Sequence, residues 1–281
     1  MSDKLVTIAI PIYNAMPYLQ DAILSVINQT YKNWILYLIN DGSTDGSLLI
    51  AKKYAELDNR IVLLNDGLNQ GLVYRLNQSV SLCTSKYYAR MDADDIMCIT
   101  RIEQQVRFME THPNVLVCGS SIMTIDNKNN IIGSRYRDGI VESFFHPTVF
   151  GRTEWFRNNP YSSWALRAED MELWLRTSAD SVFYSINKPL LFYREFGIPT
   201  FEKYRQSQLT VIRLALRYND YNKSIFWCLK MLVTSYLKII ISFLLNLFGN
   251  LDLLVAMRRA DRVPEHLVLT EYDLLLSIKN E

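Results

Sequence analysis

Two kinds of apolar segment alternate along the first part of the chain. Residues 5–10 and 34–39 are almost entirely apolar, and turn-forming residues follow each, which is typical of strands buried on both faces. Between them, residues 18–29 place Leu19 and Ile23 on one side of a helix. The pattern continues and predicts, in order, a helix over 47–56, a strand over 61–64, a helix over 71–82, a strand over 86–91 and a helix over 101–112.

This alternation of strands and helices predicts an α/β fold with a parallel, doubly wound sheet and right-handed crossovers. In such sheets, ligands bind at the carboxyl ends of the strands, so the residues that directly follow a strand are the first candidates for function. Acids or turn-forming residues occupy three of these positions, which are residues 11–14, 40–46 and 92–95.

The C-terminal third has a different pattern. Residues 224–248 are mostly apolar, with a polar residue at every fourth position, and predict a helix of roughly 36 Å. That length spans a bilayer, but Lys238 would lie near its centre, at a cost of about 2.5–3.5 kcal/mol. The pattern therefore favours a helix in the membrane interface, and a helix packed on the rest of the protein or on a second subunit is the alternative. We expect a catalytic domain over 1–220 and a helical, membrane-associating region over 221–281.

Composition adds three restrictions. Lys and Arg total 30 and Asp and Glu total 29, a net charge of +1, which argues against a nucleic-acid binder. The four cysteines form no Cys-x-x-Cys pair, so a reduced cytosol fits better than a disulfide framework, and the apolar run at the N-terminus is too brief for a signal peptide. Residues 223–262 hold six Lys and Arg against two Asp, which suits an anionic cytoplasmic membrane surface.

Asp92, Asp94 and Asp95 place three carboxylates within four residues at the end of an apolar strand. Unpaired, they would repel one another and raise their own pKa values. Mg²⁺ or Mn²⁺ removes that repulsion and also binds phosphate oxygens, so the cluster predicts a metal and diphosphate site. The alternative is a solvated acidic loop ahead of the next helix.

Asp41 stands in Asp-Gly-Ser-Thr-Asp-Gly, which is also an ordinary turn and helix-capping sequence. As a functional residue, its carboxylate would accept a hydrogen bond from a nucleobase or ribose, and Tyr13 would stack on the base.

Taken together, five segments resemble the successive motifs of family 2 glycosyltransferases with the GT-A fold. They are residues 6–14, 24–31, 40–47, 69–71 and 91–95, and the resemblance extends over about residues 5–195. Asn40 departs from the family pattern, which often has a second aspartate there, but Asp41 is intact.

The resemblance implies a mostly parallel, Rossmann-like sheet flanked by helices, with a nucleotide-sugar half at about 1–100 and an acceptor half at about 101–220. It also implies an inverting enzyme that takes a hexose from a nucleotide sugar, here a UDP-sugar. Asp94 and Asp92 would hold Mn²⁺ or Mg²⁺. The residues implied in donor binding are Pro11, Tyr13, Asn14, Asp41, Arg75, Asp92, Ala93 and Asp94.

Inverting transfer needs one general base for the acceptor hydroxyl. Residues 168–176 predict the start of an amphipathic helix with acids in its first turn. A favourable interaction with the helix dipole would by itself explain why acids stand there. Preceded by His146-Pro147, however, the segment resembles the family's Glu-Asp acceptor motif. Asp170 would then be the base, with Glu169 and Glu172 as alternatives. His146, Trp164 and Glu169 would lie on the acceptor side.

No Gln-x-x-Arg-Trp segment, which processive synthases of the family carry, follows Trp164, so transfer of a single sugar is expected. The resemblance implies a lipid-linked acceptor, an undecaprenyl diphosphate oligosaccharide used for bacterial surface polysaccharides such as O-antigen or capsule. The expected location is the cytoplasmic face of the inner membrane, as a peripheral or monotopic protein. The alternatives are a polyprenyl-phosphate glycosyltransferase, a nucleotidyltransferase and a non-catalytic sugar-nucleotide-binding or assembly protein. A homo-oligomer stays open.

Overall fold

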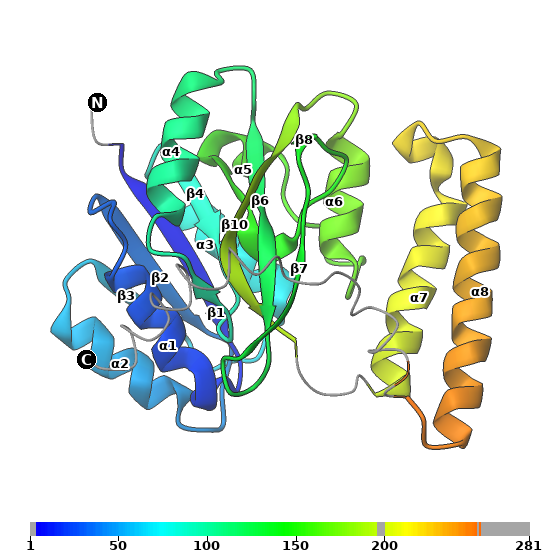
Figure 1. Cartoon of the computed structure of the whole chain (residues 1–281), viewed down its shortest axis with the longest axis horizontal. Coiled ribbons are helices and arrows are strands. Elements are labelled where there is room, and N and C mark those ends of the chain that lie inside the picture. The colour runs from blue at the N-terminus through cyan, green and yellow to red at the C-terminus, as the bar shows by residue number, and fades with distance from the viewer. Residues whose placement is uncertain (1–3, 196–199, 252, 254–281) are drawn as a thin grey trace. The chain divides into compact units, whose positions relative to one another are not determined.

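The computed structural model describes residues 4–195, 200–251 and 253 and contains one ten-stranded sheet (Figure 1). The strand order is β3-β2-β1-β4-β9-β6-β10-β5, with β7 paired to β6 and β8 paired to β10. The strands are β1 (Val6–Ile12), β2 (Trp34–Asn40), β3 (Ile61–Asn65), β4 (Tyr87–Arg90), β5 (Ile96–Met97), β6 (Val117–Ile125), β7 (Ile131–Arg135), β8 (Gly139–Ile140), β9 (Phe150–Arg152) and β10 (Phe183–Arg194).

The expected helices are confirmed, with ends displaced by one or two residues in most cases. They are α1 (Met16–Ile27), α2 (Ser47–Leu57), α3 (Leu72–Leu82), α4 (Arg101–Thr111), α6 (Glu169–Thr177) and α8 (Ile225–Leu247). Sequence reasoning did not anticipate α5 (Thr153–Asn158), α7 (Phe201–Leu216) or the 3₁₀ turns η1 (His146–Thr148) and η2 (Tyr218–Tyr221).

The sheet is mixed, which corrects the expectation of a parallel sheet. Strands β3, β2, β1 and β4 are parallel neighbours, as predicted. Beyond β4, however, β9 runs antiparallel to both β4 and β6, and β5 runs antiparallel to β10. Strand β9 has only three residues, too few to show a period in the sequence.

The core of the sheet forms around β1, whose Val6, Ile8 and Ile10 are fully buried and pack with residues of β2, β4 and α1. Each such side chain contributes about 1.5–3 kcal/mol on burial. Right-handed crossovers place α1 and α2 on one face of the sheet, and α3, which returns across β2 and β1 to β4, on the other.

The described chain forms two compact units, one of residues 4–160 and 181–195 and the other of residues 161–180 and 200–251. The first contains the whole sheet, and the second contains α6, α7, η2 and α8. Helix α7 packs with α8 within the second unit. The functional division predicted near residue 220 stays a prediction. Residues 254–281, including every Lys and Arg after α8, lie outside the described residues.

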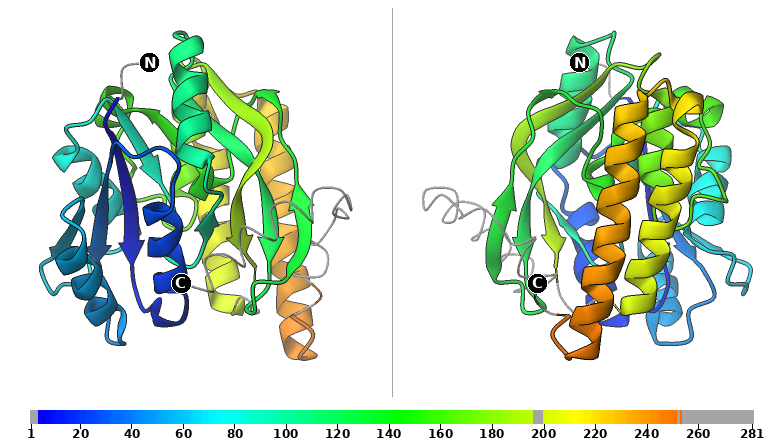
Figure 2. Two further views of the ribbon diagram at one scale, coloured as in Figure 1. Left: turned by 60° about the vertical axis from the view of Figure 1, so that its left-hand side comes forward. Right: turned by 90° about the vertical axis from the view of Figure 1, so that its right-hand side faces the viewer.

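Helix α8 is long and apolar enough to cross a membrane, judged by length and composition alone, with a mean hydropathy of 1.8. It lies beside α7 (Figure 2), and its buried residues, Cys228, Ser235 and Ser242, are small and recur every seventh position. Many of the large apolar residues of α8 are exposed, although the ring of Phe243 lies 5.8 Å from that of Phe201 on α7. Those exposed on α8 are Ile225, Phe226, Leu229, Val233, Tyr236, Leu237, Ile240, Ile241, Phe243, Leu244 and Leu247.

Candidate functional site

Three neighbouring strands of the sheet bring the predicted donor-binding residues to one edge. Strands β2, β1 and β4 are adjacent and parallel, so their carboxyl ends coincide. Asn40, the last residue of β2, pairs with Ile12 at the end of β1, and Arg90 of β4 pairs with Ala9. The structure thus gathers the three loops at 11–14, 40–46 and 91–95, which confirms the expectation that they share an edge.

Asp41 is nearly buried, and its carboxylate is held by the segment that leads into α3. Oδ1 accepts hydrogen bonds from the backbone N–H of Gln70 and from Nε of Arg75, both at 2.8 Å, and Oδ2 accepts one from the N–H of Gly71 at 3.0 Å. These bonds fix the carboxylate while Oδ2 keeps a further lone pair, which suits it to accept one more hydrogen bond.

Arg75 uses every one of its N–H groups within the protein. Its two outer nitrogens donate to the carboxylate of Asp66, to the carbonyl of Leu68 and to Oε1 of Gln78. The side chain is 1% exposed. Sequence reasoning placed Arg75 itself beside the base or the phosphates. In the structure Arg75 holds Asp41 in position, and its own contact with the donor stays a prediction.

The loop after β1 has one exposed side chain and one that ties loops together. Tyr13 is 56% exposed and is therefore accessible for stacking. Asn14 has a left-handed backbone with φ of 52°, which Asn tolerates better than most residues. Its Oδ1 accepts a hydrogen bond from the N–H of Thr44 at 2.8 Å, and its own N–H donates to Oγ of Ser43 at 3.1 Å. Pro11 is partly buried near the end of β1.

The three aspartates after β4 form one cluster, in which an oxygen from each lies within 4.8 Å of the others. Burial, and then the charge of Asp92, raise the pKa of Asp94 to about 6. The pKa of Asp95 is raised well above its usual range for the same two reasons, with Asp94 adding to the repulsion. Ala93 is buried between the first two aspartates.

This cluster fits a divalent cation. The buried Oδ1 of Asp95 accepts a hydrogen bond from the backbone N–H of Arg194 at 2.8 Å, but its Oδ2 has no hydrogen-bond partner among the described residues. Crowded carboxylates with raised pKa values and an unpartnered oxygen are the donor set that Mg²⁺ or Mn²⁺ stabilises. The assignment of Asp92 and Asp94 as its ligands stays a prediction.

Two arginines that are not among the predicted site residues contact the cluster. Arg90, buried at the end of β4, donates to the carboxylate of Asp92. Arg194, at the end of β10, donates from Nε to the carbonyl of Asp94 at 2.7 Å, and its guanidinium lies 4.2 Å from the ring centre of Tyr18. The signal for Arg90 is a charged residue inside an apolar strand, because a buried charge requires a partner. The signal for Arg194 is the pair Tyr193-Arg194, which resembles the late Tyr-Arg-x-His element of family 2 glycosyltransferases, although Phe196 stands where that element often has histidine.

His146 lies in η1, within the same unit as the aspartate cluster. Burial, and then the charge of Arg90, lower the pKa of His146 well below its usual range. The imidazole is therefore neutral at pH 7 rather than a cation. The prediction placed it on the acceptor side, and the structure adds its electrostatic link to the arginine that binds Asp92.

The acidic residues of α6 lie in the second unit, in the first helical turn as expected. Oδ1 of Asp170 accepts a hydrogen bond from the N–H of Met171 at 2.8 Å. Glu169 is nearly buried, and Glu172 is committed to an ion pair with Arg176 at 2.9 Å. Asp170 as the base, with Glu169 and Glu172 as alternatives, stays a prediction.

Trp164 also belongs to the second unit. It packs against a small buried cluster of Ala168, Leu214 and Tyr221, and the guanidinium of Arg217 lies 4.5 Å from its ring centre. The indole is therefore held in place beside a cation, and its place on the acceptor side stays a prediction.

Comparison with known sequences identifies one family. Residues 7–171 match the sequence model described as Glycosyl transferase family 2. An uncharacterised glycosyltransferase of Haemophilus influenzae is 33% identical over 224 residues, which cover 73% of this chain and 69% of that protein. The putative glycosyltransferase EpsE of Bacillus subtilis is 37% identical over 183 residues, which cover 61% of this chain and 66% of EpsE.

Solved structures show the same fold at low identity. S. aureus TarS 1–349, in complex with UDP-GlcNAc, superposes with a TM-score of 0.64 at 14% identity and covers 83% of this chain and 72% of that one. The mannosyltransferase PcManGT from Pyrobaculum calidifontis, in complex with GDP-Man and Mn²⁺, has a TM-score of 0.60 at 14% identity and covers 98% of this chain and 86% of that one.

Proposed function

Because this chain belongs to glycosyl transferase family 2 and has the GT-A fold, we propose that it transfers a single hexose, with inversion, from a UDP-sugar to a lipid-linked oligosaccharide. The acceptor is an undecaprenyl diphosphate glycan used for a bacterial surface polysaccharide, at the cytoplasmic face of the inner membrane. The observation that carries the proposal is the shared edge of β2, β1 and β4, which gathers Asp41, Tyr13 and the aspartate cluster.

On the donor side, the geometry supports binding of the nucleoside and binding of a metal ion. Tyr13 stacks on the nucleobase, and Oδ2 of Asp41 accepts a hydrogen bond from the base or the ribose. Asp92 and Asp94 hold Mn²⁺ or Mg²⁺, which when bound stabilises the negative charge of the departing diphosphate. Arg90 keeps the carboxylate of Asp92 oriented, and Arg194 holds the Asp94 backbone in place.

On the acceptor side, Asp170 takes the proton of the attacking hydroxyl as that oxygen forms its bond to the anomeric carbon. It lies in the first turn of α6, where a helix N-terminus interacts favourably with negative charge. The neutral imidazole of His146 serves as a hydrogen-bonding group for the sugar.

Helix α8 supports attachment to a membrane surface. Its small residues face α7, and its large apolar residues are exposed together with Lys230 and Lys238. A helix that exposes apolar side chains and lysines suits the interface of an anionic leaflet. Residues 223–262 are therefore the proposed membrane contact, which would keep the enzyme near a lipid-linked acceptor.

The function is tested with the full chain, Mn²⁺, and a panel of UDP-, GDP- and dTDP-sugars, with and without a lipid-linked saccharide primer. We expect a nucleoside diphosphate to be released, a chelator to abolish the release, and the anomeric configuration of the transferred sugar to be opposite to that in the donor. Release of pyrophosphate would indicate a nucleotidyltransferase. Equal turnover with plain polyprenyl phosphate would favour a polyprenyl-phosphate glycosyltransferase, and no turnover of any donor would favour a binding protein.

Asp170→Asn tests the base. Loss of a general base typically lowers the rate by about 10²- to 10⁴-fold. The matched control is Asp180→Asn, the same change at an exposed residue shortly after α6. Transfer at the wild-type rate by Asp170→Asn would show that the base assignment is wrong.

A further inference from the structure

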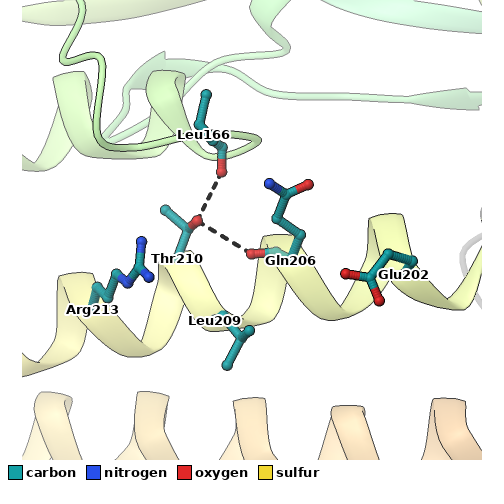
Figure 3. Close-up of a pocket in the computed structure, with 6 residues that line it drawn as sticks. All are labelled: Leu166, Glu202, Gln206, Leu209, Thr210 and Arg213. Atoms are coloured by element: carbon teal, nitrogen blue, oxygen red, sulfur yellow. Dashed lines mark hydrogen bonds between the residues drawn. The ribbon is translucent and has the colours of Figure 1, made fainter.

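Helix α7 and the segment before α6 enclose a groove in the second unit (Figure 3). One part has a volume of about 280 Å³ and is lined by Leu166, Glu202, Gln206, Leu209, Thr210 and Arg213. A second part has a volume of about 370 Å³ and is lined by Trp164, Arg213, Leu216 and Arg217. The two parts adjoin, since both include Arg213.

The groove is preformed, because two hydrogen bonds fasten its walls together. Oγ1 of Thr210 on α7 donates to the carbonyl of Leu166 at 2.8 Å (Figure 3), and Nε of Arg167 donates to Oε1 of Gln206 at 3.1 Å. Arg167 also has a left-handed backbone with φ of 63°, an uncommon conformation that turns the segment into α6. Because these residues are already ordered, a ligand that binds in the groove has little conformational entropy to overcome.

The lining combines apolar walls with cations. Trp164, Leu209 and Leu216 supply the apolar surface, and Arg213 and Arg217 supply charge. Within the described chain neither arginine forms an ion pair with a carboxylate, whereas the nearby Glu202 pairs with Arg205 at 2.8 Å. Residues 200–251 hold seven Lys and Arg against two acids. Arginine binds phosphate through paired N–H groups, so the groove is complementary to a phosphate attached to an apolar chain.

We propose that this groove binds the lipid carrier of the acceptor at its phosphate or diphosphate. Arg213 and Arg217 bind the phosphate oxygens, and Trp164 and Leu216 contact the first carbons of the chain. The identity of the lipid rests on the proposed function.

Two features of the second unit favour this occupant over other anionic amphiphiles. The wall formed by residues 161–168 leads directly into the first turn of α6, which carries Asp170. Helix α7 lies between that wall and α8, whose apolar side chains are exposed (Figure 3). A lipid carrier drawn from the membrane by α8 would thus meet the groove close in sequence to the proposed base.

The test is equilibrium binding of decaprenyl phosphate in dodecyl maltoside micelles to the full chain, with circular dichroism to confirm that each variant is folded. Arg213→Gln and Arg217→Gln should each raise the dissociation constant by about tenfold, the effect of losing one charge-assisted hydrogen bond. Arg213→Lys, which keeps the charge, should raise the dissociation constant less than Arg213→Gln does. The matched control is Lys203→Gln, which removes an exposed charge from the same helix but does not line the groove.

Two further probes identify what the groove recognises. Decaprenol, which lacks the phosphate, and inorganic phosphate, which lacks the chain, should each bind far more weakly than decaprenyl phosphate. If the arginine variants bind decaprenyl phosphate as the wild type does, or if they lose only binding to phosphatidylglycerol vesicles, the groove is not the carrier site. Because the assay contains no sugar donor, its outcome is independent of whether the chain transfers a hexose.

Discussion

Nε of Arg75 donates to Oδ1 of Asp41 over 2.8 Å, and the two side chains are only 1% and 8% exposed. The outer nitrogens of the same guanidinium bind Asp66, so one arginine joins the end of β2 to the loop that precedes α3. The predicted donor contact therefore depends on a residue that has no N–H left for the donor.

Arg75→Met should lower the free energy of unfolding by about 3 kcal/mol, because it leaves the buried carboxylate of Asp41 without its cation. Adding Asp41→Asn should restore part of that loss. Urea unfolding measures both effects. The control is Lys86→Met, which breaks an exposed pair with Glu110 and should cost no more than about 1 kcal/mol. Equal losses in Arg75→Met and Lys86→Met would contradict the role given to Arg75.

The stability of the metal-free protein should depend on Asp94 in a defined direction. Its pKa is raised from 3.8 to about 6, so the folded state binds this proton more tightly than the unfolded state. The free energy of unfolding contributed by Asp94 therefore falls as the pH rises through this interval, and Asp94→Asn removes the fall. Relative to wild type, the variant should gain on the order of 2 kcal/mol between about pH 4 and pH 7.

Thermal unfolding with a chelator, followed over that pH range, measures the difference. Adding Mn²⁺ should stabilise the wild type more above about pH 6 than at pH 5, because the carboxylate must be ionised to bind the metal. Mn²⁺ should stabilise the Asp94→Asn variant little at either pH. If the stability of the two proteins changed with pH in parallel, the pKa of Asp94 would not be raised.

Gly42 should resist substitution for two separable reasons. It has φ of +69°, and an added Cβ would lie 2.9 Å from the backbone nitrogen of Asn69. Gly67 has φ of +77° with nothing within 4 Å of an added Cβ, so Gly67→Ala measures backbone strain alone, at about 1 kcal/mol. Gly42→Ala should cost more, by thermal unfolding, and should also raise the KM for the donor, because the clash displaces the loop at 66–71 from Asp41.

Substitutions on the buried face of α8 should lower stability, whereas substitutions on its exposed face should weaken membrane binding. Ser242→Leu puts a large side chain against α7 and should destabilise the protein by about 1–3 kcal/mol. Replacing Leu237, Ile240 and Leu244 together with serine should leave stability nearly unchanged, since these side chains are exposed. The triple variant should bind anionic vesicles at least about tenfold more weakly, as sedimentation would show. Unchanged vesicle binding would count against membrane attachment through α8.

Much of the sheet unit is predictable because its signals are local. Strand β1 is apolar on both faces and so reads as a buried strand, and α1 carries its apolar residues at helical spacing. Asp41 and the aspartate cluster follow strands that lie side by side, so the rule for the ends of parallel strands locates them correctly. Strand β9 escapes the same reasoning, because three residues carry no period and its antiparallel pairing depends on partners far along the chain.

The sequence by itself determines the order of strands and helices, the strand-end motifs with their carboxylates, and the apolar character of α8, because each depends on residues that are neighbours along the chain. Only the tertiary structure decides that Arg75 holds Asp41, that Arg90 and Arg194 steady the aspartate cluster, and that α8 turns its serines toward α7. Those contacts join residues whose separation in sequence carries no signal of their partners, since hydrogen bonds and packing depend on distance in the folded chain.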